Sequence, residues 1–214
     1  MTSPASAITN ILNRPAYFLR WYQVTIAGNP NASMVYDYWI HTVAGIRNVR
    51  PGRILHFVNH NIRTYKIWSY DPGGDSFRFA SHSVQMVNEG AVAVNAVNGY
   101  LLPQPSGVTI MVTGMLTGCS FCFLDTGAGI ETAHIRPNPN NAANLRTNLI
   151  NNGQFAGHAG AGMTVYGSHA GAGGAGYDHR TENVSVIGVF QGTWSIFAQV
   201  YDANKAVVRL DQIL

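Results

Sequence analysis

Short runs of β-branched and aromatic residues, most of them ended by a cluster of Gly, Pro, Asn or Asp, extend along almost the whole chain. Residues 20–26 (RWYQVTI) end just before the cluster 28–31 (GNPN), and residues 63–70 end at the cluster 71–74 (DPGG). Such clusters stop a strand because Gly and Asn accept the backbone angles of tight turns and Pro cannot donate to a sheet ladder. Repeated runs of this length predict a mainly β chain.

The individual strands can be placed from these runs. They are predicted at 20–26, 33–40, 53–58, 63–70, 108–113, 119–124, 131–135, 163–166, 183–190, 193–201 and 205–210. Residues 77–79 and 83–87 are expected to form a short hairpin. The small apolar residues of 90–97 fit either a strand or a helix.

Helix is predicted only as a minor component. Residues 141–151 repeat apolar side chains at i, i+3 and i+7, which is typical of a helix lying on a sheet. Residues 1–15 are expected to be a flexible arm or one short helix that ends before Pro15, and the Gly-rich 153–178 to be long loops around one strand, able to cover a pocket. The predicted fold is a mainly β, minor α sandwich of mixed sheets with one or two helices, forming a single domain over 1–214.

Charge is scarce in this chain. Only 11% of the residues are charged, the net charge is +3 and no run of Lys or Arg occurs. Binding of phosphate backbones needs a clustered basic face, so nucleic acid is not expected as a partner. No apolar stretch is long enough to span a membrane, and the N-terminus lacks the pattern of a cleavable signal peptide. We therefore expect a soluble protein with no membrane partner, and export by a route without a cleaved signal stays open.

The chain has two cysteines, and they are spaced as Cys119-Ser-Phe-Cys122. C-x-x-C spacing is used by redox and zinc sites, but side chains three residues apart in a strand point to opposite faces. A second pair of ligands with zinc spacing is also missing. We expect neither a metal site nor a cofactor here.

Other patterns are weaker. Residues 171–176 match G-x-G-x-x-G but are not followed by a predicted helix, which a dinucleotide site requires. His56 and His60 are four apart in a segment that does not resemble a helix. The histidines of the Gly-rich segment are expected at the solvated surface; they are His158, His169 and His179.

Cys119 and His134 are the strongest candidates for chemistry. They are fifteen positions apart, on two predicted strands joined by the Gly-rich turn 125–129. An imidazole within hydrogen-bonding reach of a thiol can take its proton and leave a nucleophilic thiolate. From residue types and spacing alone, a small buried cysteine and a structural histidine are the more common interpretations, and catalysis is the less common one.

The run Thr113-Gly-Met-Leu-Thr-Gly-Cys119, followed by a strand, a turn and a strand with His134, resembles the glutamine-deamidase toxins. These are the catalytic domain of the cytotoxic necrotizing factors and the Burkholderia lethal factor. In that family a Leu-Ser-Gly-Cys motif carries the nucleophile; Thr117 replaces the Ser here. The resemblance covers about 25 residues. It implies Cys119 as nucleophile at the floor of a narrow cleft, His134 as base, and Thr113 orienting the imidazole through its backbone carbonyl.

The resemblance also implies an activity. Backbone N–H groups of Gly118 and Cys119 would stabilise the oxyanion while the side-chain amide of a host-protein glutamine is hydrolysed to glutamate, without cofactor. Family members act on Rho-type GTPases or on a translation-initiation helicase, so a host protein is the expected partner. The protein would act as a monomer in the host cytosol.

Three alternatives remain at this level. The same Cys–His pair could serve a transglutaminase or a cysteine protease. The chain could instead be a non-catalytic β-sandwich, a carbohydrate-binding or structural module in which Cys119 belongs to the core. Its aromatic residues could then form a stacking face. The aromatic residues proposed for that face are Tyr22, Tyr36, Tyr38, Trp39, Tyr65 and Trp68.

Overall fold

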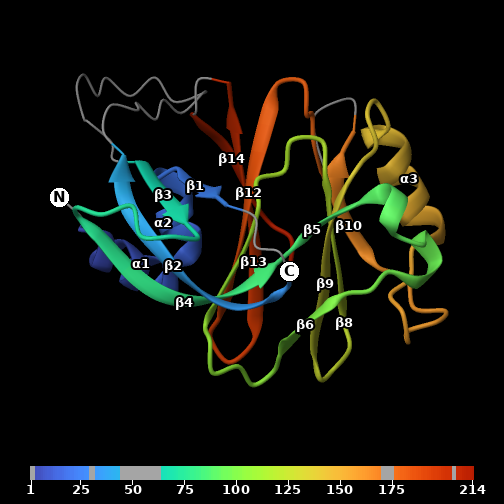
Figure 1. Ribbon diagram of the computed structural model, residues 1–214, viewed down its shortest axis with the longest axis horizontal. Coiled ribbons are helices and arrows are strands. Elements are labelled where there is room, and N and C mark those ends of the chain that lie inside the picture. The colour runs from blue at the N-terminus through green and yellow to red at the C-terminus, as the bar shows by residue number, and fades with distance from the viewer. Residues whose placement is uncertain (1–2, 29–31, 44–63, 170–175, 204–205) are drawn as a thin grey trace.

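The computed structural model describes residues 3–28, 32–43, 64–169, 176–203 and 206–214 (Figure 1). The predicted strand 53–58, the pair His56 and His60, and most of the Gly-rich motif 171–176 lie outside these residues.

Two sheets and three α-helices make up the described part of the chain. The helices are α1 (Pro4–Asn13), α2 (Pro15–Trp21) and α3 (Ala142–Asn152), with the 3-10 helices η1 (Glu89–Ala91) and η2 (Val94–Ala96). The strands are β1 (Val24–Ala27), β2 (Met34–Val43), β3 (Thr64–Trp68), β4 (Ser76–Val84), β5 (Met86–Asn88), β6 (Tyr100–Pro103), β7 (Ile110–Thr113), β8 (Ser120–Asp125), β9 (Gly129–Arg136), β10 (Thr164–Ser168), β11 (Gly176–Tyr177), β12 (Glu182–Phe190), β13 (Trp194–Asp202) and β14 (Val207–Gln212).

Both sheets are mixed. The larger has the order β1-β3-β2-β4-β7-β12-β13-β14, and its β1–β3 and β4–β7 pairs are parallel. The smaller has the order β11-β10-β8-β9-β5, with β6 also paired to β9. Its β5–β9 and β10–β11 pairs are parallel, and β8–β9 is antiparallel. The mainly β, mixed-sheet fold with minor helix is therefore confirmed.

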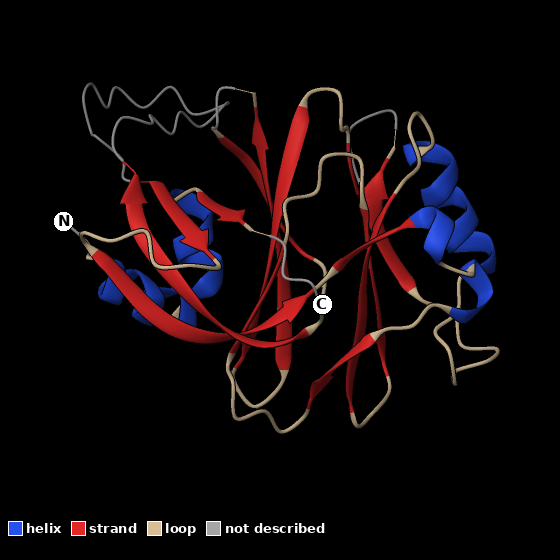
Figure 2. Cartoon of the chain, in the orientation of Figure 1, coloured by secondary structure: helices blue, strands red, loops and turns tan. Residues whose placement is uncertain are grey.

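The elements form layers (Figure 2). One core lies between the two sheets, where Phe121 and Tyr166 of the smaller sheet meet Val186 and Ile196 of the larger. Helices α1 and α2 pack on the other face of the larger sheet, and α3 packs on the other face of the smaller one. The sandwich thus has helices on both outer faces, which leaves the inter-sheet core as the setting for the candidate site.

The N-terminal segment is not a flexible arm. Pro4 begins α1 behind Ser3, whose hydroxyl caps the backbone N–H of Ser6 at 3.2 Å, and Pro15 begins α2. Pro suits the first helical turn because its missing N–H would have no partner there. Ile8 and Ile11 of α1 are buried in the core under the larger sheet. The alternative of one short helix ending before Pro15 is correct for α1, and α2 was not expected.

Other boundaries also differ from the sequence prediction. The run 20–26 is divided: its first two residues end α2 and only Val24–Ala27 forms a strand. The expected hairpin 77–87 is wrong, because β4 continues through Val84 and β5 then pairs with the other sheet. Residues 90–97 contribute to two 3-10 helices. Helix α3 matches the predicted 141–151 to within one residue, and its buried Leu145 and Leu149 contact the smaller sheet.

Candidate functional site

Cys119 lies at the end of the connection from β7 in the larger sheet to β8 in the smaller one. Gly118, just before it, has φ +110°, a left-handed backbone conformation that residues with a Cβ rarely adopt. The glycine allows the chain to turn sharply so that Cys119 precedes Ser120, the first residue of β8.

The strand register places Cys119 and His134 on one face of the smaller sheet. Phe121 pairs with His134 across β8 and β9, and Cys119, two residues before Phe121, points to the same side. Cys119 and Phe121 belong to the inter-sheet core, whereas Cys122 belongs to the core under α3. The expectation that the two cysteines face opposite ways is therefore confirmed. Both thiols are free, and burial raises the pKa of Cys122 to about 12.

Thr113 at the end of β7 contacts His134 through its hydroxyl. The Thr113 Oγ1 and His134 Nδ1 atoms are 2.7 Å apart, and Oγ1 also donates to the backbone oxygen of Val84 at 2.7 Å. The hydroxyl has one proton, which goes to Val84, so it must accept from Nδ1–H of the imidazole. The neutral tautomer is thereby set, with its lone pair on Nε2. The expected contact through the Thr113 carbonyl is replaced by one through the side chain.

His134 is completely buried, and burial lowers its pKa to about 3. Its Nε2 has no hydrogen-bond partner among the described residues. A buried acceptor without a partner is costly in a folded protein, and Nε2 is one of several such buried atoms among the described residues. The imidazole is therefore held neutral, in a fixed tautomer, with an unused acceptor atom.

The sulfur of Cys119 contacts Met86 rather than His134. Its Sγ lies 3.9 Å from Sδ of Met86, and within the described residues no hydrogen bond links Sγ to Nε2 of His134. Burial raises the pKa of Cys119; the backbone N–H groups of Thr117 and Cys119 and the charge of Arg136 act in the opposite direction. The structure thus places the two predicted residues on one face without bringing their reacting atoms into contact.

Tyr177 changes the expected oxyanion site. The N–H of Gly118 donates to the Tyr177 hydroxyl at 2.7 Å, and that hydroxyl donates to the carbonyl of Cys119 at 2.9 Å. The Gly118 N–H, predicted as an oxyanion donor, is therefore bonded to the Tyr177 hydroxyl in this structure. The backbone N–H groups of Thr117 and Cys119 act instead on the sulfur of Cys119 and lower its pKa.

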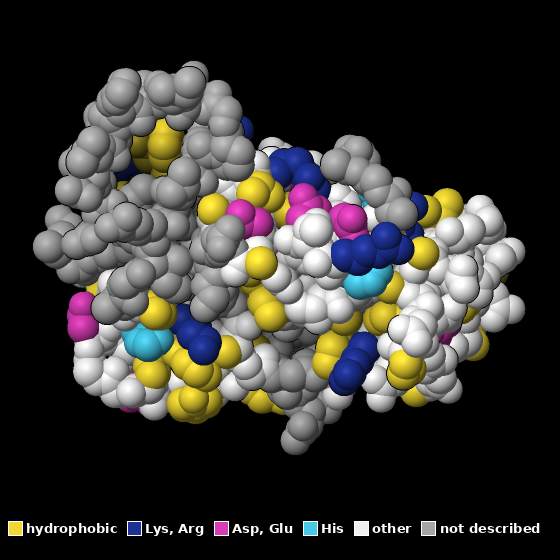
Figure 3. All heavy atoms as spheres, turned by 90° about the horizontal axis from the view of Figure 1, so that it is seen from above, with side chains coloured by type: hydrophobic (Ala, Val, Ile, Leu, Met, Phe, Trp, Pro, Cys, Tyr) yellow, Lys and Arg dark blue, Asp and Glu magenta, His cyan; other side chains and the backbone are white. Residues whose placement is uncertain are grey.

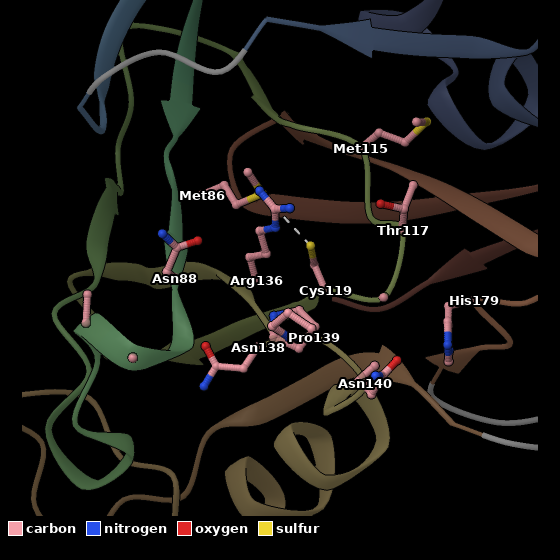
Figure 4. A pocket seen from close by; sticks show the side chains of 15 residues that line it. Met86, Asn88, Met115, Thr117, Cys119, Arg136, Asn138, Pro139, Asn140 and His179 are labelled. Atoms are coloured by element: carbon pink, nitrogen blue, oxygen red, sulfur yellow. Dashed lines mark hydrogen bonds between the residues drawn. The ribbon is translucent and has the colours of Figure 1, made fainter.

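A cavity of about 1120 Å³ opens beside Cys119 (Figure 4). Cys119, Met86, Arg136 and His179 line it, and His134 does not. The expected narrow cleft is thus a wide cavity, with the thiol on its wall and the imidazole behind that wall. His179 is exposed, as predicted for the histidines of the Gly-rich segment, and it bonds through Nδ1 to the Ser168 hydroxyl.

Sequence reasoning missed Met86, Arg136 and Tyr177 as parts of this site. Arg136 alone carried a usable signal, because it lies two residues after His134 in a strand and so points to the same face. Met86 and Tyr177 reach the site through pairing of distant segments, β5 with β9 and β11 with β10.

The aromatic residues proposed for a stacking face do not form one surface. Tyr38 and Tyr65 are buried in the core under the larger sheet, and Tyr22 and Tyr36 pack against that core. Trp39 and Trp68 are half-buried neighbours on β2 and β3. Lys66 Nζ already covers the Trp68 ring at 3.7 Å from its centre. The carbohydrate-binding alternative therefore loses the continuous platform on which it depended.

No protein family matches this sequence, and no curated protein matches it. Within the described segments, no three His, Cys, Asp or Glu side chains are grouped so that they could hold a metal ion. None of the helices in those segments has the length and apolar character needed to cross a bilayer. Seen from above, acidic and basic side chains lie next to each other instead of forming a patch of one sign (Figure 3).

Proposed function

We propose that this protein is a cysteine-dependent protein-glutamine deamidase. Cys119 is the nucleophile, His134 the general base and Thr113 the residue that orients His134. The observation that carries the proposal is the tautomer of His134: Thr113 holds its Nδ1–H, and the unpartnered Nε2 lies on the sheet face that also bears Cys119. A base must present a lone pair, and this arrangement supplies one on the same sheet face as a thiol that lines a cavity.

The first half of the reaction transfers the acyl group. Nε2 of His134 takes the proton of Cys119, and the thiolate attacks the carbonyl carbon of the glutamine side chain. A C–S bond forms while the carbonyl electrons move to oxygen, near the N–H groups of Thr117 and Cys119. His134 then returns the proton to nitrogen, the C–N bond breaks and ammonia leaves.

The second half uses water. His134 takes a proton from a water molecule, which attacks the thioester carbon. The C–S bond breaks, the thiol regains its proton and glutamate is released. No group beyond the protein side chains and water is needed for this balance.

Met86 must move away from the sulfur of Cys119 before this chemistry can occur. Burial disfavours both the thiolate of Cys119 and the imidazolium of His134, so the ion pair is costly while Met86 covers the sulfur. Methionine changes rotamer easily, and its displacement by an entering carboxamide would admit polar groups to both residues. We include this movement of Met86 in the proposal.

The proposed partner is a protein of a host cell, in keeping with the resemblance to toxins. The direct test is incubation of the protein with a eukaryotic cell lysate, followed by peptide mass spectrometry for glutamine converted to glutamate. Conversion by the parent protein and its loss in Cys119→Ser support the proposal. Equal conversion by both proteins, or none by the parent, contradicts it.

Two additions to the same experiment separate the alternatives. If putrescine in the lysate becomes attached to glutamine, the acceptor is an amine and the enzyme is a transglutaminase. If new peptide termini depend on Cys119, the same pair cleaves backbone amides. Conversion of glutamine without either product favours deamidation.

A further inference from the structure

Arg136 ends β9 beside the candidate nucleophile. Ser120 pairs with Ile135, so the next residue of β9 lies alongside Cys119, which immediately precedes β8. Figure 4 shows the Arg136 side chain reaching toward Cys119 and Met86 in the cavity. Its positive charge lowers the pKa of Cys119, in the direction opposite to the larger effect of burial.

The guanidinium of Arg136 has no ion-pair or hydrogen-bond partner in the described part of the chain, and its side chain is exposed. None of the residues that line the cavity is Asp or Glu. The carboxylate of Glu89, close in the fold, is already bonded to the N–H of Asn138 at 2.8 Å and the amide of Asn141 at 2.6 Å. The cavity therefore presents a positive charge that the protein itself does not neutralise.

The rest of the lining suits an anion. Asn88, Asn138 and Asn140 add amide donors, and His179 adds an imidazole. A cavity of about 1120 Å³ is larger than one glutamine side chain needs, so residues next to the glutamine also enter it. One planar guanidinium matches one carboxylate in a two-bond contact, whereas phosphate-binding sites commonly gather several arginines.

We propose that Arg136 binds the carboxylate of an Asp or Glu adjoining the target glutamine, so that the substrates are acidic segments. This inference rests on the proposed deamidase function. Arg136 acts as a specificity residue: it holds the flanking carboxylate and thereby places the neutral carboxamide at Cys119.

The test compares two alkylating reagents, of which one carries a negative charge and the other does not. Iodoacetate carries a carboxylate and iodoacetamide a carboxamide, and each forms a C–S bond with the Cys119 thiolate while iodide leaves. Because both reagents react with the same thiolate, an effect of Arg136 on the thiol pKa cancels in the ratio of their rates. Mass spectrometry assigns the modification to Cys119 rather than to Cys122.

The expected result is that the ratio of iodoacetate to iodoacetamide rates falls about tenfold in Arg136→Gln, the size expected for one charge-assisted contact. Arg136→Lys should retain part of the preference, since it keeps the charge and loses the planar fork. Arg20→Gln is the matched control, because Arg20 is exposed on α2 at the opposite side of the sandwich from α3. It should leave the ratio unchanged.

The outcomes separate the two proposals. An unchanged ratio in Arg136→Gln overturns carboxylate recognition and leaves the deamidase proposal standing. A changed ratio supports recognition, and the lysate experiment then tests independently whether glutamine is the reacting group. If neither reagent modifies Cys119, the cavity does not give access to the sulfur and both proposals fail.

Discussion

Nδ1 of His134 donates a hydrogen bond to the hydroxyl of Thr113 across the two sheets, and the same hydroxyl donates to the carbonyl of Val84. Three groups from β9, β7 and β4 thus form a chain in which each polar atom has a defined direction. Because all of them are buried, loss of one member leaves another without a partner.

The first prediction concerns the hydrogen bonds that link His134, Thr113 and Val84. Thr113→Val keeps the shape of the side chain but removes the acceptor of Nδ1–H, so the free energy of unfolding should fall by about 1–3 kcal/mol. Thr113→Ser retains the hydroxyl, so its free energy of unfolding should fall by a smaller amount. Urea unfolding of the three proteins measures the difference, and equal losses in both variants would show that the methyl group, rather than the hydroxyl, matters.

The second prediction separates chemistry from folding. Cys119→Ser is nearly isosteric and should change the free energy of unfolding by no more than about 1 kcal/mol, while glutamine conversion is abolished. Cys122→Ser is the matched control, because Cys122 is buried on the other face under α3. Folded Cys122→Ser should still convert glutamine to glutamate. If this variant loses the activity while it remains folded, Cys119 is not the sole nucleophile.

The third prediction is a dependence of stability on pH. Burial lowers the pKa of His134 from 6.5 to about 3 in the folded protein, so between these values the unfolded chain binds a proton that the folded chain does not. The free energy of unfolding should therefore fall as pH decreases from about 6.5, by up to about 1.4 kcal/mol per pH unit from this residue.

A variant isolates that contribution. His82 also has its pKa lowered by burial and changes stability in the same direction, so the wild-type slope alone is not diagnostic. His134→Gln keeps an amide donor for Thr113 but cannot titrate. Urea unfolding at pH 6 and pH 4 should show a smaller loss in this variant than in the parent, and identical losses would mean that His134 is not buried in neutral form.

The fourth prediction concerns Tyr177. Its hydroxyl accepts from the N–H of Gly118 and donates to the carbonyl of Cys119, so Tyr177→Phe leaves two buried backbone groups without partners. The expected cost is about 1–3 kcal/mol of unfolding free energy, together with faster hydrogen exchange in the segment 114–119. Tyr70→Phe, at a side chain that is 54% exposed, serves as a control and should show neither effect.

The alternation of side chains along a strand is sufficient for predictions that concern residues close together in the sequence. Cys119 and Cys122 face opposite cores because three residues in a strand reverse the side-chain direction, and that inference needed only their spacing. The run RWYQVTI misled because aromatic residues favour strands, yet its start lies in a helix whose Phe18 stacks on Tyr22 at 4.7 Å in the core.

The parts that could not be predicted depend on contacts between distant segments. Met86 pairs with His134 through a parallel register that no local pattern encodes. Whether Thr113 would use its carbonyl or its hydroxyl depended on how the two sheets face each other, which period-two patterns do not determine. The hydrogen bond from the Gly118 N–H to the Tyr177 hydroxyl likewise cannot be predicted without knowing that β11 pairs with β10.

The last prediction concerns the cover over the thiol. Met86 lies opposite His134 in the register, and its Sδ contacts Sγ of Cys119 at 3.9 Å. Cys119 is only 3% exposed, so the thioether is a large part of what limits access to the sulfur. Met86→Ala should therefore increase the rate of alkylation of Cys119 by iodoacetamide several-fold. Met86→Leu, which keeps most of the volume, should not.

The two variants distinguish access from a change in thiol acidity. A larger opening lowers the desolvation of the thiolate as well, so the pH at which alkylation is half-maximal should also move down in Met86→Ala. Met86→Leu should leave that midpoint near the parent value, because the sulfur stays covered. If Met86→Ala alkylates no faster than the parent, another group closes the thiol, and movement of Met86 is not the step that brings substrate to Cys119 and His134.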